Sequence, residues 1–313
     1  MLGSAVVRRL SREQCEVVTV EKRILDLTDA RRVATWLADA KPDAIVLAAA
    51  RVGGIQANLS YPASFLQQNL AIVLNVVEAA RQARVGRLVN FGSSCMYPRA
   101  APQPITEDCL LSGPLEPTNE AYAMAKISGV KLVESYRRQY GCDFISMVPT
   151  NLYGPGDNFD PDGGHVIPGL IKRFGAAIKS GARSMEIWGS GKPRREFMFV
   201  DDAADAVVFL LQHYSDDKPI NVGIGTDISI AELANELASI VRFEGRLEFD
   251  SSKPDGMARK LLDSSRLRRL GWQGARPLQQ GLQETYAWFR ERELQDQPVD
   301  GLRAATKVSY GTA

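Results

Sequence analysis

Metal-binding residues are scarce in this sequence of 313 residues, which has two histidines and four cysteines. They are His165, His213, Cys15, Cys95, Cys109 and Cys142. The cysteines include no Cys-x-x-Cys pair, and no histidine lies at metal-ligand spacing from them, so the sequence predicts no metal site. Reduced thiols in a cytoplasmic protein are the default expectation for such a pattern.

An excess of charge of one sign is also missing, because 38 Lys and Arg residues nearly balance 37 Asp and Glu residues. This balance argues against a nucleic-acid-binding protein. No apolar run is long enough to span a bilayer, and no charged segment followed by an apolar one begins the chain. Membrane insertion and secretion are therefore not expected.

Strand-like and helical segments alternate through the first half of the chain. The strand-like segments are 16–20, 44–48, 87–91 and 143–148, and the helical ones are 30–40, 61–84 and 119–140. This alternation predicts an α/β protein with a doubly wound parallel sheet, Rossmann-like, with helices on both faces. Ligands bind at the carboxyl ends of such strands, where residues 48–50, 92–94 and 149–151 fall.

The pattern changes after Pro155, where a segment rich in Asp, Gly and Pro precedes further predicted elements. These are a helix over 165–180, a strand over 196–200 and a helix from 201. We predict a nucleotide-binding domain over 1–155 with a return segment near 197–225. Residues 156–196 and 226–292 would form a smaller C-terminal α/β substrate lobe, and 293–313 a flexible tail.

A doubly wound nucleotide-binding fold opens with a strand and a Gly-x-x-Gly-x-x-Gly turn. Residues 4–10 are typical of the helix that follows this turn, with Gly3 as its last glycine. The expected first strand and the other glycines do not precede it. A mis-assigned or truncated start is the explanation we favour. The alternatives are another segment or subunit in that place, or a variant that binds cofactor poorly.

Tyr122 and Lys126 are the strongest catalytic candidates on residue chemistry alone. They are four residues apart in a predicted helix, so both side chains lie on one face. We expect the ammonium to favour the ionised phenol, lower the pKa of Tyr122 and make it a usable proton donor or acceptor. Ser93 follows the strand 87–91, where it could hold a substrate oxygen against this tyrosine. An ordinary helix surface is the alternative for the spacing by itself.

Seven stretches carry a resemblance that extends over nearly all of the chain. They are residues 47–55, 92–98, 115–126, 149–155, 165–168, 188–197 and 252–256. On these stretches the chain resembles the extended short-chain dehydrogenases/reductases and, within them, the GDP-L-fucose synthase family. Ser93, Tyr122 and Lys126 indicate only the broad superfamily. Cys95 directly after the serines, together with His165-Val-Ile-Pro168, is more specific.

The resemblance implies two reactions on GDP-4-keto-6-deoxy-D-mannose in one site. The C4 ketone acidifies the hydrogens at C3 and C5, so a base and an acid on opposite faces of the ring can invert both carbons. The resemblance implies Cys95 as the base, His165 as the acid, and Ser93 and Tyr122 as donors to the enolate oxygen. NADPH then reduces the ketone to give GDP-L-fucose, with Tyr122 as proton donor and Lys126 on the nicotinamide ribose. Packing is the alternative for Cys95, and helix capping is the alternative for His165.

The resemblance also implies a set of contacts to NADP(H). They are Gly3, Lys22, Asp26, Leu27, Phe91, Gly92, Ser93, Ser94, Lys126, Pro149, Thr150, Asn151, Leu152 and His165. Glu21, after the strand 16–20, would suit the ribose hydroxyls of NAD. Lys22 and Arg23 supply cations for the 2′-phosphate, so NADP is the favoured cofactor.

The substrate contacts that the resemblance implies are Arg173, Trp188, Arg195 and Asp255, which would bind a GDP-sugar. Arginine suits a diphosphate, and an aspartate can accept from guanine or ribose donors. Without the resemblance, Trp188 would be expected in the core and the arginines on a solvated surface. The long helices 61–84 and 119–140 could form the four-helix interface of a homodimer.

Two rival functions remain open on the sequence. One is another nucleotide-sugar epimerase or dehydratase of the same superfamily. A simple 4-epimerase would not need Cys95 and His165, and the residues after Ser94 offer no acidic side chain of the kind a dehydratase commonly has. The other rival is a binding or regulatory protein without its cofactor loop.

Overall fold

The main sheet has four parallel strands in the order β1-β2-β3-β8. The computed structural model describes residues 1–313 except 161–163, 254, 275 and 295–313. The strands are β1 (Ala44–Leu47), β2 (Arg87–Phe91), β3 (Asp143–Pro149) and β8 (Ile220–Val222). The predicted α/β class with a parallel sheet is therefore confirmed.

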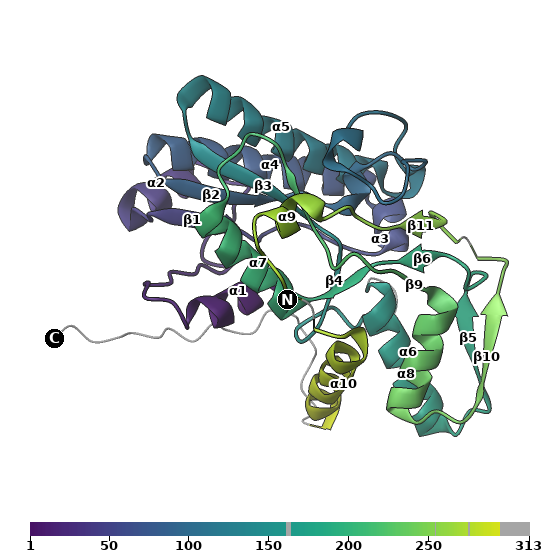
Figure 1. Cartoon of the computed structure of the whole chain (residues 1–313). Coiled ribbons are helices and arrows are strands. Elements are labelled where there is room, and N and C mark those ends of the chain that lie inside the picture. The colour runs from purple at the N-terminus through teal and green to yellow at the C-terminus, as the bar shows by residue number, and fades with distance from the viewer. Residues whose placement is uncertain (161–163, 254, 275, 295–313) are drawn as a thin grey trace.

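Alternate residues of the strands face two separate hydrophobic cores, as the twofold period of a strand requires. Leu88 and Phe144 pack with α2 (Ala30–Ala40), α4 (Pro62–Gln82) and α5 (Glu120–Tyr140). Val89 and Ile145 face the opposite way and pack with α1 (Leu2–Leu10), α7 (Val200–His213) and α9 (Ser265–Arg269). Helices thus cover both faces of the sheet (Figure 1).

The strand predicted over 16–20 is wrong, because these residues adopt no regular secondary structure. Val17 and Val18 are exposed at 37% and 56%. Their β propensity is not sufficient by itself, since a strand needs a neighbour to take up its backbone hydrogen bonds. In the described part of the chain, β1 is the edge of the main sheet and 16–20 have no strand to pair with.

The remaining predicted elements of the first half are present, with ends within about two residues of the predictions. Pro62 begins α4, where its missing N–H costs nothing. Gly141 ends α5 and Gly181 ends α6 (Val166–Ser180), each in the left-handed conformation that favours glycine. The predicted strand 196–200 is shorter, as β7 (Phe197–Phe199), because α7 begins one residue earlier than expected.

Short sheets and helices from the second half surround a further core. The strand pairs are β5 (Ser184–Trp188) with β10 (Arg246–Asp250), β4 (Asn151–Tyr153) with β7, and β6 (Arg194–Arg195) with both β9 (Ile228–Ser229) and β11 (Arg259–Lys260). The helices are α6, α8 (Ile230–Val241) and α10 (Leu278–Leu294). A capping box between Ser229 and Glu232 fixes the start of α8.

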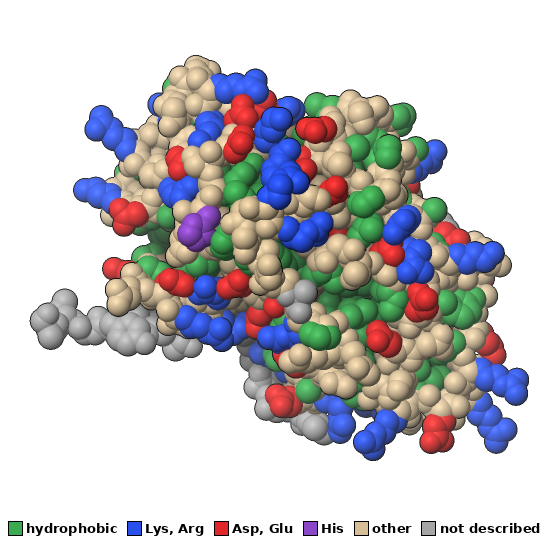
Figure 2. All heavy atoms as spheres, viewed as in Figure 1, with side chains coloured by type: hydrophobic (Ala, Val, Ile, Leu, Met, Phe, Trp, Pro, Cys, Tyr) green, Lys and Arg blue, Asp and Glu red, His purple; other side chains and the backbone are tan. Residues whose placement is uncertain are grey.

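Four short elements complete the described structure near the ends of the main strands. They are α3 (Ile55–Ser60) and the 3-10 turns η1 (Ser94–Met96), η2 (Glu107–Cys109) and η3 (Pro117–Asn119). The tail predicted for 293–313 lies outside the described residues apart from 293–294, which end α10. In the described residues, no helix is both long and apolar enough to cross a membrane. Figure 2 shows basic and acidic side chains interspersed over one face of the molecule.

Candidate active site

Four of the five predicted catalytic residues, Ser93, Cys95, Tyr122 and Lys126, converge where β2 ends and α5 begins. Among the described residues, no hydrogen bond or ion pair joins the fifth, His165, to them. Ser93 follows β2, and its hydroxyl accepts the backbone N–H of Cys95 at 3.3 Å. Tyr122 and Lys126 lie in the first turns of α5, and the Ser93 hydroxyl also interacts with the Tyr122 phenol. Lys126 Nζ donates to the carbonyl oxygen of Phe91, the last residue of β2, at 3.0 Å. One strand end and one helix start therefore place a serine, a thiol, a phenol and an ammonium together.

The electrostatic expectation for Tyr122 is wrong in this structure. Burial raises the pKa of Tyr122, the neighbouring Cys95 raises it further, and the hydrogen bond with Ser93 offsets only part of the effect. Burial also lowers the pKa of Lys126 to about 8. The ammonium lies 5.8 Å from the centre of the phenol ring, rather than against its oxygen. Desolvation of both groups thus outweighs their mutual attraction.

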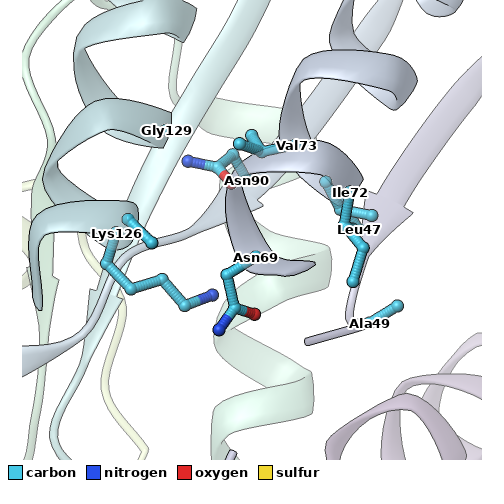
Figure 3. Close-up of a pocket in the computed structure, with 9 residues that line it drawn as sticks. Leu47, Ala49, Asn69, Ile72, Val73, Asn90, Lys126 and Gly129 are labelled. Carbon is cyan, nitrogen blue, oxygen red and sulfur yellow. The ribbon is translucent and has the colours of Figure 1, made fainter. Parts of the chain in front are cut away.

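A small cavity of about 10 Å³ adjoins Lys126, between α4, α5 and the strands β1 and β2. Its polar lining is Asn69, Asn90 and Lys126, and its volume suits about one water molecule. Figure 3 shows the Lys126 amine and the Asn69 side chain pointing toward each other across it. Backbone groups fix Asn69, which donates to the carbonyls of Arg51 and Phe65 and accepts the N–H of Arg51. The lysine therefore extends beside a rigid polar wall.

Two donors contact the Cys95 sulfur. Asn119 Nδ2 is 3.3 Å from it, and Lys260 Nζ is 3.4 Å from it. Burial raises the pKa of the Cys95 thiol, but the charge of Lys260 and the hydrogen bonds from Ser93, Lys260 and Asn119 outweigh it. The net shift of the Cys95 pKa is downward, which favours the nucleophilic and basic thiolate.

Lys260, which reaches Cys95 from β11, was not predicted from the sequence. The lysine is only 7% exposed, and a lysine is rarely buried to that extent without a partner. A lysine directly before the buried pair Leu261 and Leu262 was the local signal that could have drawn attention to it.

His165 precedes α6, and Asp157 lies beside it. His165 Nδ1 is 3.8 Å from Asp157 Oδ1, and the carboxylate raises the pKa of His165 against the opposing effect of burial. Asp157 is only 4% exposed and also accepts the N–H of Asn158. The sequence analysis missed Asp157 because it lies in a polar loop without periodicity.

The residues predicted to contact the cofactor fall into two groups. Those of 91–94 and 149–152 are neighbours, because β2 pairs with β3 and Gly92 N donates to Met147 O at 2.8 Å. Gly3 lies beside the end of β1, because a Cβ atom placed on Gly3 would be 3.6 Å from the Cβ atom of Ala48. Lys22, Asp26 and Leu27 lie in the loop before α2, where Leu27 O accepts from Asn75. In the described part of the chain, no hydrogen bond or ion pair joins these three residues to the catalytic ones.

The residues predicted to contact the substrate form two adjacent groups around the short sheets and α6. Trp188 is 55% exposed rather than buried in the core, and its ring lies 5.6 Å from the Arg173 guanidinium and 5.7 Å from Lys253 Nζ. Asp255 accepts the N–H and hydroxyl of Ser190, each at 2.7 Å. An exposed indole between cations is a surface on which a base can stack.

Arg195 joins these groups to the catalytic residues. Its Nη2 donates to the Asp255 carbonyl at 3.5 Å, and its charge interacts with Cys95. Arg195 also pairs in register with Lys260 across β6 and β11. Among the described residues, no group of three or more His, Cys, Asp or Glu could hold a metal ion. The arrangement can therefore bind an anionic ligand beside a thiol–phenol site.

Comparisons with known proteins identify relatives of this chain. A model of the NAD dependent epimerase/dehydratase family matches residues 1–225. The chain is 50% identical over 289 residues to a GDP-L-fucose synthase of Sinorhizobium fredii, covering 92% of each chain. It is 49% identical over 303 residues to a GDP-L-fucose synthase of Escherichia coli, covering 94% of each. A crystal structure of a GDP-L-fucose synthetase from Naegleria fowleri bound to NADP matches with a TM-score of 0.86 at 29% identity, covering 94% of this chain and 92% of that chain.

Proposed function

The chain belongs to the NAD-dependent epimerase/dehydratase family and, within it, to the GDP-L-fucose synthases, and from this premise we propose its reaction. It converts GDP-4-keto-6-deoxy-D-mannose to GDP-L-fucose by epimerisation at C3 and C5, followed by NADPH-dependent reduction of the C4 ketone. The observation that carries this proposal is a thiol with two donors, Lys260 and Asn119, inside a Ser–Tyr–Lys site. A simple ketone reductase needs the serine, tyrosine and lysine but has no use for a thiol base.

Epimerisation uses the acidity of the hydrogens next to the ketone. Cys95 takes a proton from C3 or C5 as a thiolate, and the negative charge moves to the ketone oxygen. Ser93 and Tyr122 donate hydrogen bonds to that oxygen. His165, protonated with the help of Asp157, returns a proton to the opposite face of the carbon and inverts it.

Reduction uses the same oxygen-binding groups. Two features of the chain fit NADPH. One is the half-buried cation Lys126, whose amine reaches the end of β2 from α5, and the other is the exposed cation Lys22, which suits a 2′-phosphate. When bound, NADPH supplies the hydride for C4. Ser93 orients the ketone, Tyr122 gives its proton to the oxygen, and Lys126 binds the ribose hydroxyls.

We assign the GDP moiety to Arg173, Trp188, Arg195 and Asp255. The exposed indole suits the guanine base and the arginines suit the diphosphate. In this proposal the doubly wound domain comprises 1–155 and 197–225, and the substrate lobe comprises 156–196 and 226–292. The separate hydrophobic core around α6, α8 and α10 supports that division.

We further propose a cytoplasmic homodimer that pairs α4 and α5 with the same helices of a second copy. Leu74 on α4 and Met124 on α5 are exposed at 47% and 42%, as apolar residues of an interface would be in a single chain. All four cysteines are free thiols, as a reducing compartment requires.

The test is to incubate the purified protein with NADPH and GDP-4-keto-6-deoxy-D-mannose. NADPH binding is followed by nicotinamide fluorescence, its oxidation by absorbance, and the product by NMR. We expect GDP-L-fucose formed in a one-to-one ratio with NADPH oxidised. A lack of NADPH binding at about millimolar concentration, or a product with unchanged C3 and C5, would overturn the proposal.

A further inference from the structure

Lys260 enters the catalytic site from a part of the chain far from the other catalytic residues. It is separated from Cys95 by 165 residues and lies on the two-residue strand β11. β11 pairs with β6, and Figure 1 shows both beside α3, between the main sheet and the second-half helices. The residue is 7% exposed, so its ammonium has little access to water.

A buried ammonium costs several kcal/mol unless a partner compensates it. In the described part of the chain, Lys260 forms no ion pair with a carboxylate, and its hydrogen bond goes to the Cys95 sulfur at 3.4 Å. The partner is thus a group that can itself become an anion. A thiolate would compensate the ammonium, whereas a neutral thiol is only a weak acceptor.

The other groups around Cys95 also favour the anion. Ser93 and Asn119 are neutral hydrogen-bonding groups, and Arg195 is a second cation in electrostatic contact. Burial raises the pKa of Cys95, yet the charge of Lys260 and the surrounding donors reverse the shift. Lys260 provides the largest contribution in the favourable direction.

We propose that Lys260 is a positioning residue that pairs with the Cys95 sulfur and keeps it as the thiolate that takes the proton from carbon. This inference rests on the epimerase–reductase function proposed above. In the step, the C–H electron pair forms the carbon–carbon double bond of the enolate, the carbonyl pair moves to the oxygen, and the proton ends on sulfur. The ammonium keeps its own protons throughout.

The proposal predicts a separation of the two reactions. Epimerisation needs the thiolate, so it depends on Lys260. Hydride reduction of a ketone that already has the product configuration needs Ser93, Tyr122 and Lys126 but not the thiolate. Lys260→Met should therefore impair deuterium exchange at C3 and C5 about tenfold or more while reduction of the epimerised ketone continues. A merely structural role would reduce both reactions together.

The direct test measures the Cys95 thiol without any substrate. Cys95 is alkylated with iodoacetamide over a range of pH, and mass spectrometry reads the peptide that carries it. In Lys260→Met we expect the midpoint of the reaction to rise by about one to two pH units, and in Lys260→Arg to stay near the wild-type value. Lys218→Met, which removes an exposed lysine before β8, is the matched control and should leave the midpoint unchanged.

An unchanged midpoint in Lys260→Met overturns the inference. If that variant does not fold, the pH midpoint of Cys95 alkylation in the wild-type protein is the test. A midpoint at or above the ordinary thiol value of about 8.5 overturns the inference, and a lower midpoint supports it. The proposed function fails separately, if wild-type protein catalyses no exchange at C3 and C5. Exchange by the wild type together with an unmoved midpoint in Lys260→Met refutes the role of Lys260 alone.

Discussion

Replacing Asp157 by asparagine should narrow the pH range of epimerisation from its alkaline side. The acid of this reaction is His165, which must be protonated, and Asp157 raises its pKa. Because a raised pKa keeps the imidazolium present to higher pH, removing the carboxylate should make activity fall at lower pH. The acidic limb belongs to Cys95 and should stay in place, since the substitution leaves the contacts of Cys95 intact.

The size of the shift follows from the separation of the two groups. A charge pair at 3.8 Å interacts by about 4 kcal/mol at an effective dielectric constant of about 20. The His165 side chain is 47% exposed, so solvent screening leaves roughly a third of that energy. The alkaline limb should therefore move down by about one pH unit, which is about a tenfold loss of rate above the limb and almost none below it.

The assay is deuterium exchange at C3 and C5 of GDP-4-keto-6-deoxy-D-mannose, followed by NMR without NADPH so that reduction does not intervene. Asp39→Asn, which removes a carboxylate from the exposed face of α2, is the control. The reasoning is refuted if the alkaline limb of Asp157→Asn coincides with that of the wild type. A uniform loss at all pH values would equally refute it, because it would indicate a structural role for Asp157.

Three further predictions concern other residues. Cys95→Ser should abolish exchange at C3 and C5 yet leave reduction of the epimerised ketone; exchange at the wild-type rate would remove Cys95 as the base. Lys126→Met should weaken NADPH binding. The affinity of the wild type for NADPH should decline as the pH rises through about 8, because burial lowers the pKa of Lys126 to about 8. NADPH titrations in which the affinity does not change with pH would contradict this. Glu196→Gln should destabilise the fold by about 2 kcal/mol in urea unfolding. Both carboxylate oxygens accept backbone N–H groups, from Gly225 at 2.7 Å and Leu262 at 3.1 Å, and the amide of glutamine has only one acceptor oxygen. Equal unfolding midpoints of the variant and the wild type would contradict this reasoning.

Local signals predicted much of the site. The spacing of Tyr122 and Lys126 places both on one helix regardless of the rest of the fold, and the position of Ser93 after an apolar run places it at a strand end. Tertiary packing determines two features that these local signals did not predict: whether a segment forms a strand and how exposed a side chain is. The segment 16–20 has strong β propensity but no neighbouring strand in the described structure. Trp188 is exposed, although a large aromatic side chain is by itself expected in the core.

The two missed residues have a common physical cause. Lys260 and Asp157 act through a partner that is brought close only by folding, and neither has a periodic or motif context in the sequence. The predicted effect of Lys126 on Tyr122 was wrong for a related reason, since burial of both side chains dominates their pKa values. Spacing predicts which groups meet, whereas desolvation depends on the surrounding atoms.

We propose that one site both epimerises and reduces a GDP-bound keto sugar. The most direct measurement is a complete reaction of GDP-4-keto-6-deoxy-D-mannose with NADPH in deuterium oxide, with the product analysed by NMR. We expect GDP-L-fucose that carries deuterium at both C3 and C5, and no such product when the Cys95→Ser variant replaces the wild type. A reduced product that retains the original hydrogens and configuration at C3 and C5 would contradict it.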